Sequence, residues 1–234
     1  MPNSLSNTSV LLFADDSTFF KPGPNIIWLQ RAVQKDLDVL QHWCNTWGFK
    51  ISTEKTVGVL FTHSTNRPNI KIEVGGSPIN IKHSARFLGM IFDKSLTWSE
   101  HIEYVINKCN KRLNLMRAVS GTRWGANETS LLTIYRILIR SILDYGAAAY
   151  DSASISQLRK LDKIQYSALK LCFGAMKSTS ASALQVESGE APLHLRRLEQ
   201  QIKFSIKIKA SVNHAANSVL QDHWTTHWKV YRQQ

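Results

Sequence analysis

Residues 9–20 read Ser-Val-Leu-Leu-Phe-Ala-Asp-Asp-Ser-Thr-Phe-Phe, two apolar runs separated by Asp15, Asp16 and Ser17. The first run has the length and composition of a buried strand, and the second returns to residues that favour strands. Acidic turn residues between two such runs predict a tight hairpin. A hairpin would hold both carboxylates together at its tip.

A long helix is predicted next, from Asn25 to Trp47, because apolar residues recur there every three or four positions. Asn25 can cap its start and Gly48 can end it. The face expected to be apolar consists of Ile26, Leu29, Val33, Leu37, Leu40, Cys44 and Trp47. Three runs rich in Val, Ile and Phe predict strands at 56–62, 70–74 and 87–92.

From Thr97 onward the apolar period becomes helical. Helices are predicted from Thr97 to Gly121, from Asn127 to Gly146, from Ser154 to Gly174 and over 192–210. Thr97 with Glu100, and Ser154 with Gln157, have the spacing of capping boxes. The inward faces are expected to be Ile102, Val105, Ile106, Cys109, Leu113 and Met116; then Leu131, Ile134, Tyr135, Leu138 and Ile142; then Leu158, Leu161, Gln165, Ala168, Leu169 and Cys172. The fold class is therefore α+β, an α+β part followed by an all-helical part.

The charge of the chain is concentrated in its helical part. The 234 residues carry 29 Lys and Arg against 17 Asp and Glu, a net charge of +12. Residues 1–100 hold 10 basic and 8 acidic side chains, whereas 101–234 hold 19 and 9. Such an excess predicts a polyanionic partner, nucleic acid first and an acidic membrane second.

Composition excludes several other classes of protein. A hydrophobic fraction of 43% excludes a disordered basic tail. No run approaches the roughly 18 apolar residues of a membrane span, and the first ten residues do not resemble a signal peptide. Three scattered cysteines, Cys44, Cys109 and Cys172, support neither a disulfide framework nor a zinc knuckle. An intracellular location is expected, with nucleus and cytoplasm not distinguished.

Asp15 and Asp16 are the first candidates for chemistry. Adjacent carboxylates supply the oxygen ligands that Mg²⁺ prefers, and paired Mg²⁺ ions assist phosphoryl transfer. The alternative is that Asp-Asp-Ser is an ordinary turn sequence.

The residues around this pair point to one family. Residues 11–16 resemble the aromatic-x-Asp-Asp box of reverse transcriptases, in the Phe-Ala-Asp-Asp form of non-LTR (LINE-type) retrotransposons. Further segments resemble the same family in the same order, the last one being similar to jockey-like elements. They are 48–56, 87–93, 96–102, 143–146, 161–170 and 186–197.

The resemblance implies a role for several residues of this chain. Asp15 and Asp16 would be catalytic metal ligands, with Asp15 the more direct ligand of Mg²⁺, and Phe13 would lie beside the primer end. Lys55 would donate a proton to pyrophosphate, and Phe87, Leu88 and Gly89 would form the primer grip. An RNA template, a DNA primer and deoxynucleoside triphosphates would be the partners, with no membrane.

The same resemblance implies a domain plan. Residues 1–96 would be a partial polymerase palm, built from an antiparallel hairpin, strands and a long helix. Residues 97–175 would be a thumb-like helical bundle, and 176–234 a helical extension. Basic side chains of the last two parts would contact nucleic acid: Lys108, Lys111, Arg112, Arg196, Lys203 and Lys207. The last three share a helical face opposite Leu195, Leu198, Ile202 and Ile206, and the alternative is an ordinary solvated face.

The chain also departs from the family pattern. The third catalytic aspartate and the fingers of the family lie upstream of the Asp-Asp box, but only 12 residues precede Phe13 here, and Ser52 stands where Asn is usual. We therefore expect a fragment that is inactive alone, binding two Mg²⁺ only in the complete enzyme.

The alternatives are a non-catalytic nucleic-acid-binding relic and a basic scaffold for a protein partner. His223 and His227 have metal-ligand spacing without a third ligand, and Trp224 and Trp228 suggest an apolar patch.

Overall fold

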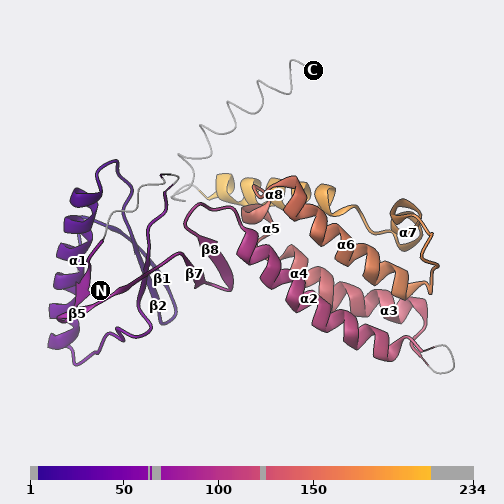
Figure 1. The fold of residues 1–234 in the computed structure, drawn as a ribbon, viewed down its shortest axis with the longest axis horizontal. Coiled ribbons are helices and arrows are strands. Elements are labelled where there is room, and N and C mark those ends of the chain that lie inside the picture. Colours follow the sequence, from indigo (N-terminus) through magenta and orange to yellow (C-terminus); the bar gives the residue numbers. More distant parts are fainter. Residues whose placement is uncertain (1–4, 63, 65–69, 122–124, 212–234) are drawn as a thin grey trace, which may run out of the picture. The chain divides into compact units, whose positions relative to one another are not determined.

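The chain forms two compact units, Met1–Leu96 and Thr97–Gln234. The computed structural model describes residues 5–62, 64, 70–121 and 125–211 (Figure 1). The first unit combines strands with one long helix and the second is helical, so the predicted α+β class is confirmed. Within the described ranges, no helix is long and apolar enough to cross a membrane.

The predicted hairpin is present at residues 9–20. Strand β1 (Ser9–Phe13) pairs in antiparallel fashion with β2 (Asp16–Phe20), and Phe13 lies opposite Asp16. Only Ala14 and Asp15 therefore form the turn.

Helix α1 (Ile26–Thr46) lies within one residue of its predicted bounds. The Asn25 side chain accepts hydrogen bonds from the backbone N–H groups of Ile27 and Trp28, which is a standard N-cap. The predicted stripe is confirmed at its centre, where Leu37, Leu40 and Cys44 are buried with Val74. Trp47, expected on the same face, is instead exposed.

Short strands complete the first unit. They are β3 (Val57–Val59), β4 (Glu73–Val74), β5 (Ser77–Pro78), β6 (Asn80–Lys82), β7 (Ser84–Phe87) and β8 (Met90–Asp93). β3 pairs in parallel with β6, whereas β4–β5 and β7–β8 are antiparallel hairpins. The single strand predicted at 87–92 is wrong, because the chain reverses at Leu88 and Gly89, with φ of 46° and 80°. Two consecutive residues with positive φ form the tight turn typical of a two-residue hairpin, which the apolar run concealed.

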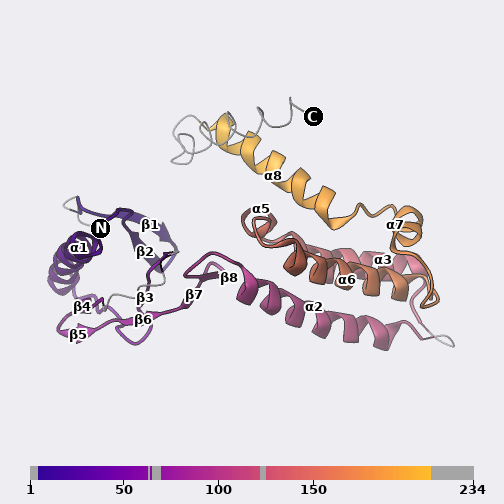
Figure 2. The same ribbon diagram turned by 45° about the horizontal axis from the view of Figure 1, so that its top comes forward.

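The second unit is a helical bundle (Figure 2). Its elements are α2 (Ser99–Val119), α3 (Glu128–Tyr135), η1 (Arg136–Arg140), α4 (Ser141–Asp144), α5 (Ala147–Tyr150), α6 (Ile155–Cys172), α7 (Ala181–Ser188) and α8 (Leu193–Ala210). α2 packs along α6, α3 also contacts α6, and α8 contacts α5 and α6. The buried faces of α2 and α6 include the predicted residues, except that Ile106 is only partly buried. His101 and Ile164, which were not predicted, are buried as well.

The N-terminal ends of α2 and α6 differ from the predicted capping boxes. The N-cap of α2 is Trp98, which has a left-handed backbone and makes no side-chain cap. Ser154 does precede α6, but its hydroxyl bonds to Ser156, while the Gln157 amide reaches Ser99. At α6, a hydroxyl pair two residues apart and a hydrogen bond to the first residue of α2 take the place of the predicted box.

The helix predicted from Asn127 to Gly146 contains a π-helical turn, η1, that shifts its inward face. Leu131, Tyr135, Ile139 and Leu143 are buried, each four residues after the last. An α-helix has 3.6 residues per turn, so a strict spacing of four needs a wider turn. Consequently Ile134, Leu138 and Ile142, expected to be buried, are only partly covered.

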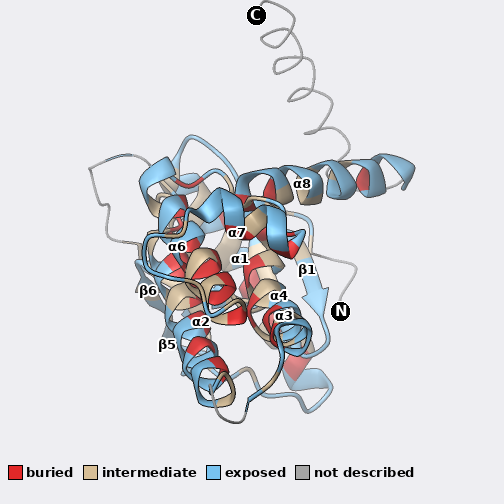
Figure 3. Cartoon of the chain, turned by 90° about the vertical axis from the view of Figure 1, so that its right-hand side faces the viewer, coloured by how far each residue is buried: buried red, intermediate tan, exposed pale blue. Residues whose placement is uncertain are grey.

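Helix α8 turns a different face inward from the one expected. Leu193, Arg197 and Ile208 are buried, whereas the predicted apolar face is 43–63% exposed (Figure 3). That exposed face is Leu195, Leu198, Ile202 and Ile206. Its orientation follows from ion pairs: Arg196 binds Asp144 through two hydrogen bonds of 2.6 and 2.5 Å, and Arg197 binds Asp151 at 2.5 Å.

A buried carboxylate, Glu190, joins the loop before α8 to the π-helical turn. It accepts hydrogen bonds from Arg136 at 2.7 Å and from Arg140 at 2.9 Å. Arg136 also donates to the carbonyl of Ser188 at 3.3 Å. Nearby, the buried amide of Gln165 donates to the carbonyl of Ala191 at 2.9 Å. These contacts connect segments more than 20 residues apart in sequence.

Replacing Glu190 by Gln should destabilise the second unit. Removing one partner of a buried ion pair costs about 3–5 kcal/mol, and we expect about 2 kcal/mol here because both arginines retain partial contact with water. Urea unfolding of the full chain, followed by circular dichroism at neutral pH, measures the change. Glu187→Gln, on the exposed side of α7, should change stability by less than about 0.5 kcal/mol. Equal unfolding midpoints for the two variants would contradict the assignment.

Candidate active site

Asp15 and Asp16 lie at the tip of the β1–β2 hairpin. Both are exposed, Asp15 in the turn and Asp16 as the first residue of β2. Because Phe13 is directly opposite Asp16 in the register, these two side chains project from the same face of the hairpin. The structure thus brings together three of the residues predicted from the sequence, Phe13, Asp15 and Asp16.

A single alanine makes the turn tight. Ala14 has a φ of 51°, in the left-handed region that costs a non-glycine residue about 1–2 kcal/mol. A two-residue hairpin loop needs positive φ, so this conformation is what places the second carboxylate at the start of β2. The acidic pair is therefore held by backbone geometry rather than by side-chain contacts.

The hairpin tip suits a hard cation but does not by itself enclose one. Adjacent carboxylates are the oxygen donors that Mg²⁺ takes, usually one or two from protein, with water and phosphate filling the other positions. Among the described residues, no cluster of three or more His, Cys, Asp or Glu could hold a metal ion. His223 and His227, with Trp224 and Trp228, lie outside the described residues. Within the described residues, the tip therefore lacks the ligands of a complete metal site.

A buried aspartate on α1, absent from the sequence predictions, anchors the base of this hairpin. Asp36 is 1% exposed and accepts four hydrogen bonds of 2.7–3.0 Å from the backbone and side chains of Asn7 and Thr8. Burial alone would raise the pKa of Asp36, but these hydrogen bonds outweigh it and lower the pKa below its ordinary value. The only sign of this role in the sequence is that Asp36 is an acidic residue next to the apolar positions of α1.

The other candidates of the first unit lie on different elements. Lys55 is exposed in the turn before β3, where the backbone N–H and hydroxyl of Thr56 both donate to the carbonyl of Ser52. Phe87 ends β7, and Leu88 and Gly89 form the turn to β8. These residues make a second hairpin tip in the same unit.

The basic candidates of the second unit fall into two groups. Lys108, Lys111 and Arg112 are exposed on α2, and the Lys108 ammonium lies 5.6 Å from the ring centre of Tyr104. On α8, the charge of Arg196 is compensated by Asp144, whose hydrogen bonds raise the pKa of the guanidinium. Lys203 pairs with Glu199 at 2.5 Å, and Lys207 is exposed. The α2 group is therefore the stronger candidate for contacts with phosphate.

Comparison with known proteins finds relatives of this chain among retrotransposon polymerases. The chain is 28% identical over 182 residues to the RNA-directed DNA polymerase from mobile element jockey of Drosophila funebris, covering 75% of the chain and 20% of that protein. It is 27% identical over 170 residues to the corresponding Drosophila melanogaster protein, covering 71% and 18%. The chain is related to the jockey-like reverse transcriptases of non-LTR retrotransposons.

A second group of relatives extends the match. A Pol polyprotein from type-1 retrotransposable element R1 4 of Nasonia vitripennis is 24% identical over 212 residues, covering 83% of the chain and 54% of that protein. The chain thus spans about a fifth of the length of the jockey polymerases and about half of this R1 protein. No family model matches the chain, and no solved structure matches it significantly.

Asp36→Asn should loosen the hairpin that carries the acidic pair. Hydrogen bonds to a charged group contribute about 1.5–3 kcal/mol, so amide hydrogen exchange in residues 7–20 should accelerate about tenfold or more at neutral pH. Asp38→Asn is the matched control, because Asp38 is exposed on the same helix and accepts a hydrogen bond from Gln34, one helical turn earlier. Unchanged exchange in Asp36→Asn would show that Asp36 does not anchor the hairpin.

The lowered pKa of Asp36 also fixes the sign of the pH dependence. Its contribution to stability is complete above the pKa of the unfolded chain, about 3.9, and is lost as the pH falls through the lower folded value. The amide resonances of Asn7 and Thr8 should therefore keep their native shifts down to about pH 4. They should move only below that pH, and Asp36→Asn should abolish the transition.

Proposed function

We propose that this chain is the part of a jockey-like reverse transcriptase that carries the Asp-Asp box. In the complete enzyme the reaction is template-directed transfer of a nucleotidyl group to the 3′-hydroxyl of a DNA primer paired with RNA. The observation that carries the proposal is the fixed hairpin tip, where Asp15 and Asp16 stand beside the exposed ring of Phe13.

Each residue of the tip has a defined task in this proposal. Asp15 and Asp16 supply carboxylate oxygens to Mg²⁺, with Asp15 the more direct ligand. When bound there, two metal ions would supply activation of the attacking hydroxyl and neutralisation of the leaving pyrophosphate. Phe13 offers an apolar surface to the primer end, and Lys55 donates a proton to the pyrophosphate. Phe87, Leu88 and Gly89, on the second hairpin tip, hold the primer strand.

The hairpin also supports the proposal that the chain alone is inactive. β1 and β2 form a two-stranded sheet, and Leu11, Leu12 and Phe13 are 51–61% exposed on it. Two strands with so much exposed apolar surface are marginally stable without further packing. A third carboxylate and a covering element from a longer polypeptide would complete the site. On this proposal, residues 1–96 are the distal palm, 97–175 the thumb and 176–234 an extension.

The metal-binding role can be measured without catalysis. Mn²⁺ added to ¹⁵N-labelled protein should broaden the amide signals of residues 13–17 selectively, with a dissociation constant of about a millimolar, because only two carboxylates are present. Asp15→Asn and Asp16→Asn should each abolish most of the broadening, whereas Asp38→Asn should leave it unchanged. Broadening that is independent of both residues would overturn the metal role.

The chain alone should not extend a primer on an RNA template with Mg²⁺ and deoxynucleoside triphosphates. Extension by the purified protein that Asp15→Asn abolishes would contradict the proposed incompleteness.

A second candidate function is non-catalytic nucleic-acid binding. It is favoured by the exposed side chains of Lys108, Lys111 and Arg112 on α2. Because cations that contact phosphates displace counterions, binding should weaken steeply with salt.

Replacing these three α2 residues with Gln should lower the slope of log K against log salt by about three for duplex DNA. Fluorescence anisotropy of a labelled oligonucleotide measures the slope. Lys35→Gln on α1 is the control. Binding that is unaffected by Asp15→Asn would favour the non-catalytic function, and a slope unchanged in the triple variant would exclude α2 as the contact surface.

A further inference from the structure

Three aromatic rings gather at the carboxyl end of α1, away from the Asp-Asp turn in sequence. The rings of Trp43 and Phe49 are stacked, with centroids 5.8 Å apart and planes inclined by 14°. The Trp47 ring lies 6.4 Å from that of Trp43, inclined by 43°. We call Trp43, Trp47 and Phe49 the aromatic platform.

Backbone geometry fixes the platform. Gly48 ends the helix in the left-handed region, with a φ of 72°, and the Phe49 N–H then donates to the carbonyl of Cys44 at 2.8 Å. This reversal folds Phe49 back over Trp43, which in turn packs against the buried core of Leu40 and Cys44. The rings are therefore positioned before any ligand arrives.

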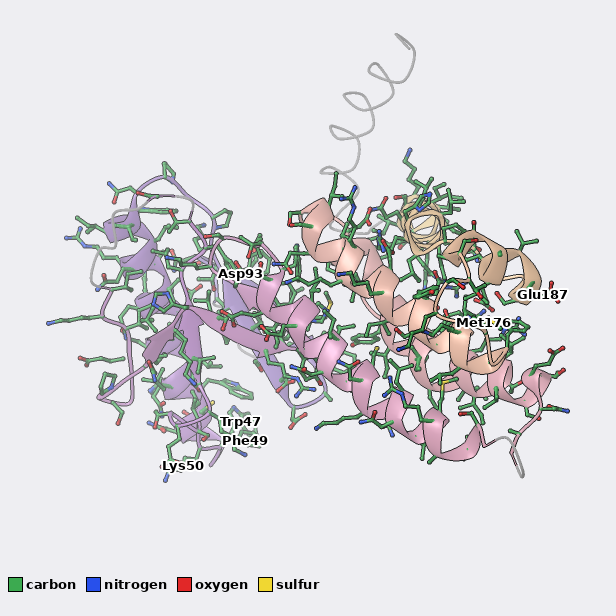
Figure 4. The ribbon with its side chains drawn as sticks, turned by 45° about the vertical axis from the view of Figure 1, so that its right-hand side comes forward. Trp47, Phe49, Lys50, Asp93, Met176 and Glu187 are labelled. Carbon is green, nitrogen blue, oxygen red and sulfur yellow. The ribbon has the colours of Figure 1, made fainter. Side chains whose placement is uncertain are left out.

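The platform is exposed on its outer side. Trp47 is 67% and Phe49 60% exposed, and Figure 4 shows the two beside Lys50 at one end of the first unit. Rings of this size bury 150–250 Å² each, so the free aromatic area is on the order of 300 Å². A stable protein interface needs about 800 Å² per partner. The patch is too small for a protein partner by itself but matches the face of one or two nucleobases.

Local charge agrees with a nucleic-acid ligand. Two lysines, Lys50 and Lys55, follow the platform and are exposed, against a single acid, Glu54. Aromatic rings next to cations are the usual composition of surfaces that bind single strands, where bases stack and phosphates meet lysine.

We propose that the aromatic platform binds single-stranded nucleic acid, stacking one or two unpaired bases on Trp47 and Phe49 while Lys50 contacts a phosphate. The choice of nucleic acid as the ligand rests on the proposed function, but the site is separate from the metal-binding turn. A base-paired duplex hides its base faces, so it does not use this site.

The test compares Trp47→Ala/Phe49→Ala with the unchanged full chain. Anisotropy of labelled 12-mers of deoxythymidine and of uridine gives the affinity at several salt concentrations. Stacking on aromatic rings predicts a loss of about fivefold to a hundredfold for single strands, with the salt slope unchanged. Affinity for a duplex of equal length should stay within about twofold. Lys50→Gln should instead lower the salt slope by about one.

Two further variants keep the test decisive. Trp28→Ala removes another exposed tryptophan, 51% exposed, whose ring already has the Lys21 ammonium 4.9 Å from its centre, so binding should be unchanged. Trp47→Phe keeps an aromatic face and should retain most of the affinity. The proposal is overturned if the unchanged chain does not bind single strands, if the double variant binds within twofold of it, or if Trp28→Ala loses as much. None of these outcomes affects the Mn²⁺ measurement on Asp15 and Asp16, so the two proposals can fail separately.

Discussion

A carboxylate removed from water must be surrounded by donors, and this constraint organises both units of the chain. In the first unit, Asp36 draws the segment before β1 onto α1 through the four groups of Asn7 and Thr8. In the second, Glu190 draws the loop before α8 onto Arg136 and Arg140. Each acid joins elements that hydrophobic burial alone would leave free to slide, because apolar contacts are non-directional.

The segments of the helical unit that resemble the retrotransposon family contact one another through such buried polar groups. Segments 143–146 and 186–197, far apart in sequence, meet through Asp144 and Arg196. Segment 161–170 contributes Gln165, which bonds to the carbonyl of Ala191. Resemblance to a polymerase had suggested nucleic-acid contacts for Arg196, but its guanidinium is engaged by a carboxylate of the same unit. The residues that remain exposed on α2 are better suited to phosphate, since their charge is not compensated by such a bidentate pair.

The sequence predicted correctly the elements whose structure depends on neighbouring residues. The hairpin at 9–20, α1 with its Asn25 cap, and the buried faces of α2 and α6 all followed from periodicity and turn chemistry. The misses have tertiary causes. The strand expected at 87–92 is interrupted by the β7–β8 turn at Leu88 and Gly89. The inward face around Tyr135 is shifted by the π-helical turn, and α8 is oriented by ion pairs rather than by its exposed leucines. Within the candidate site, the acidic pair could be predicted from the sequence. The role of Asp36 could not be predicted, because its hydrogen-bond donors lie 28 and 29 residues away in the sequence.

The π-helical turn has a consequence for how this helix can change over time. A wider turn accommodates one residue more than an α-helical turn would, so the helix from Glu128 to Asp144 contains two rotational frames. Deleting a single residue within 136–140 would convert the wide turn into an ordinary α-helical turn, and the residues after it would keep close to their present faces. Leu143 would stay in the core and Asp144 would still face Arg196. At this turn the helix can therefore lose one residue without compensating changes in α8, whereas the same deletion elsewhere in the helix would rotate everything after it by about 100°.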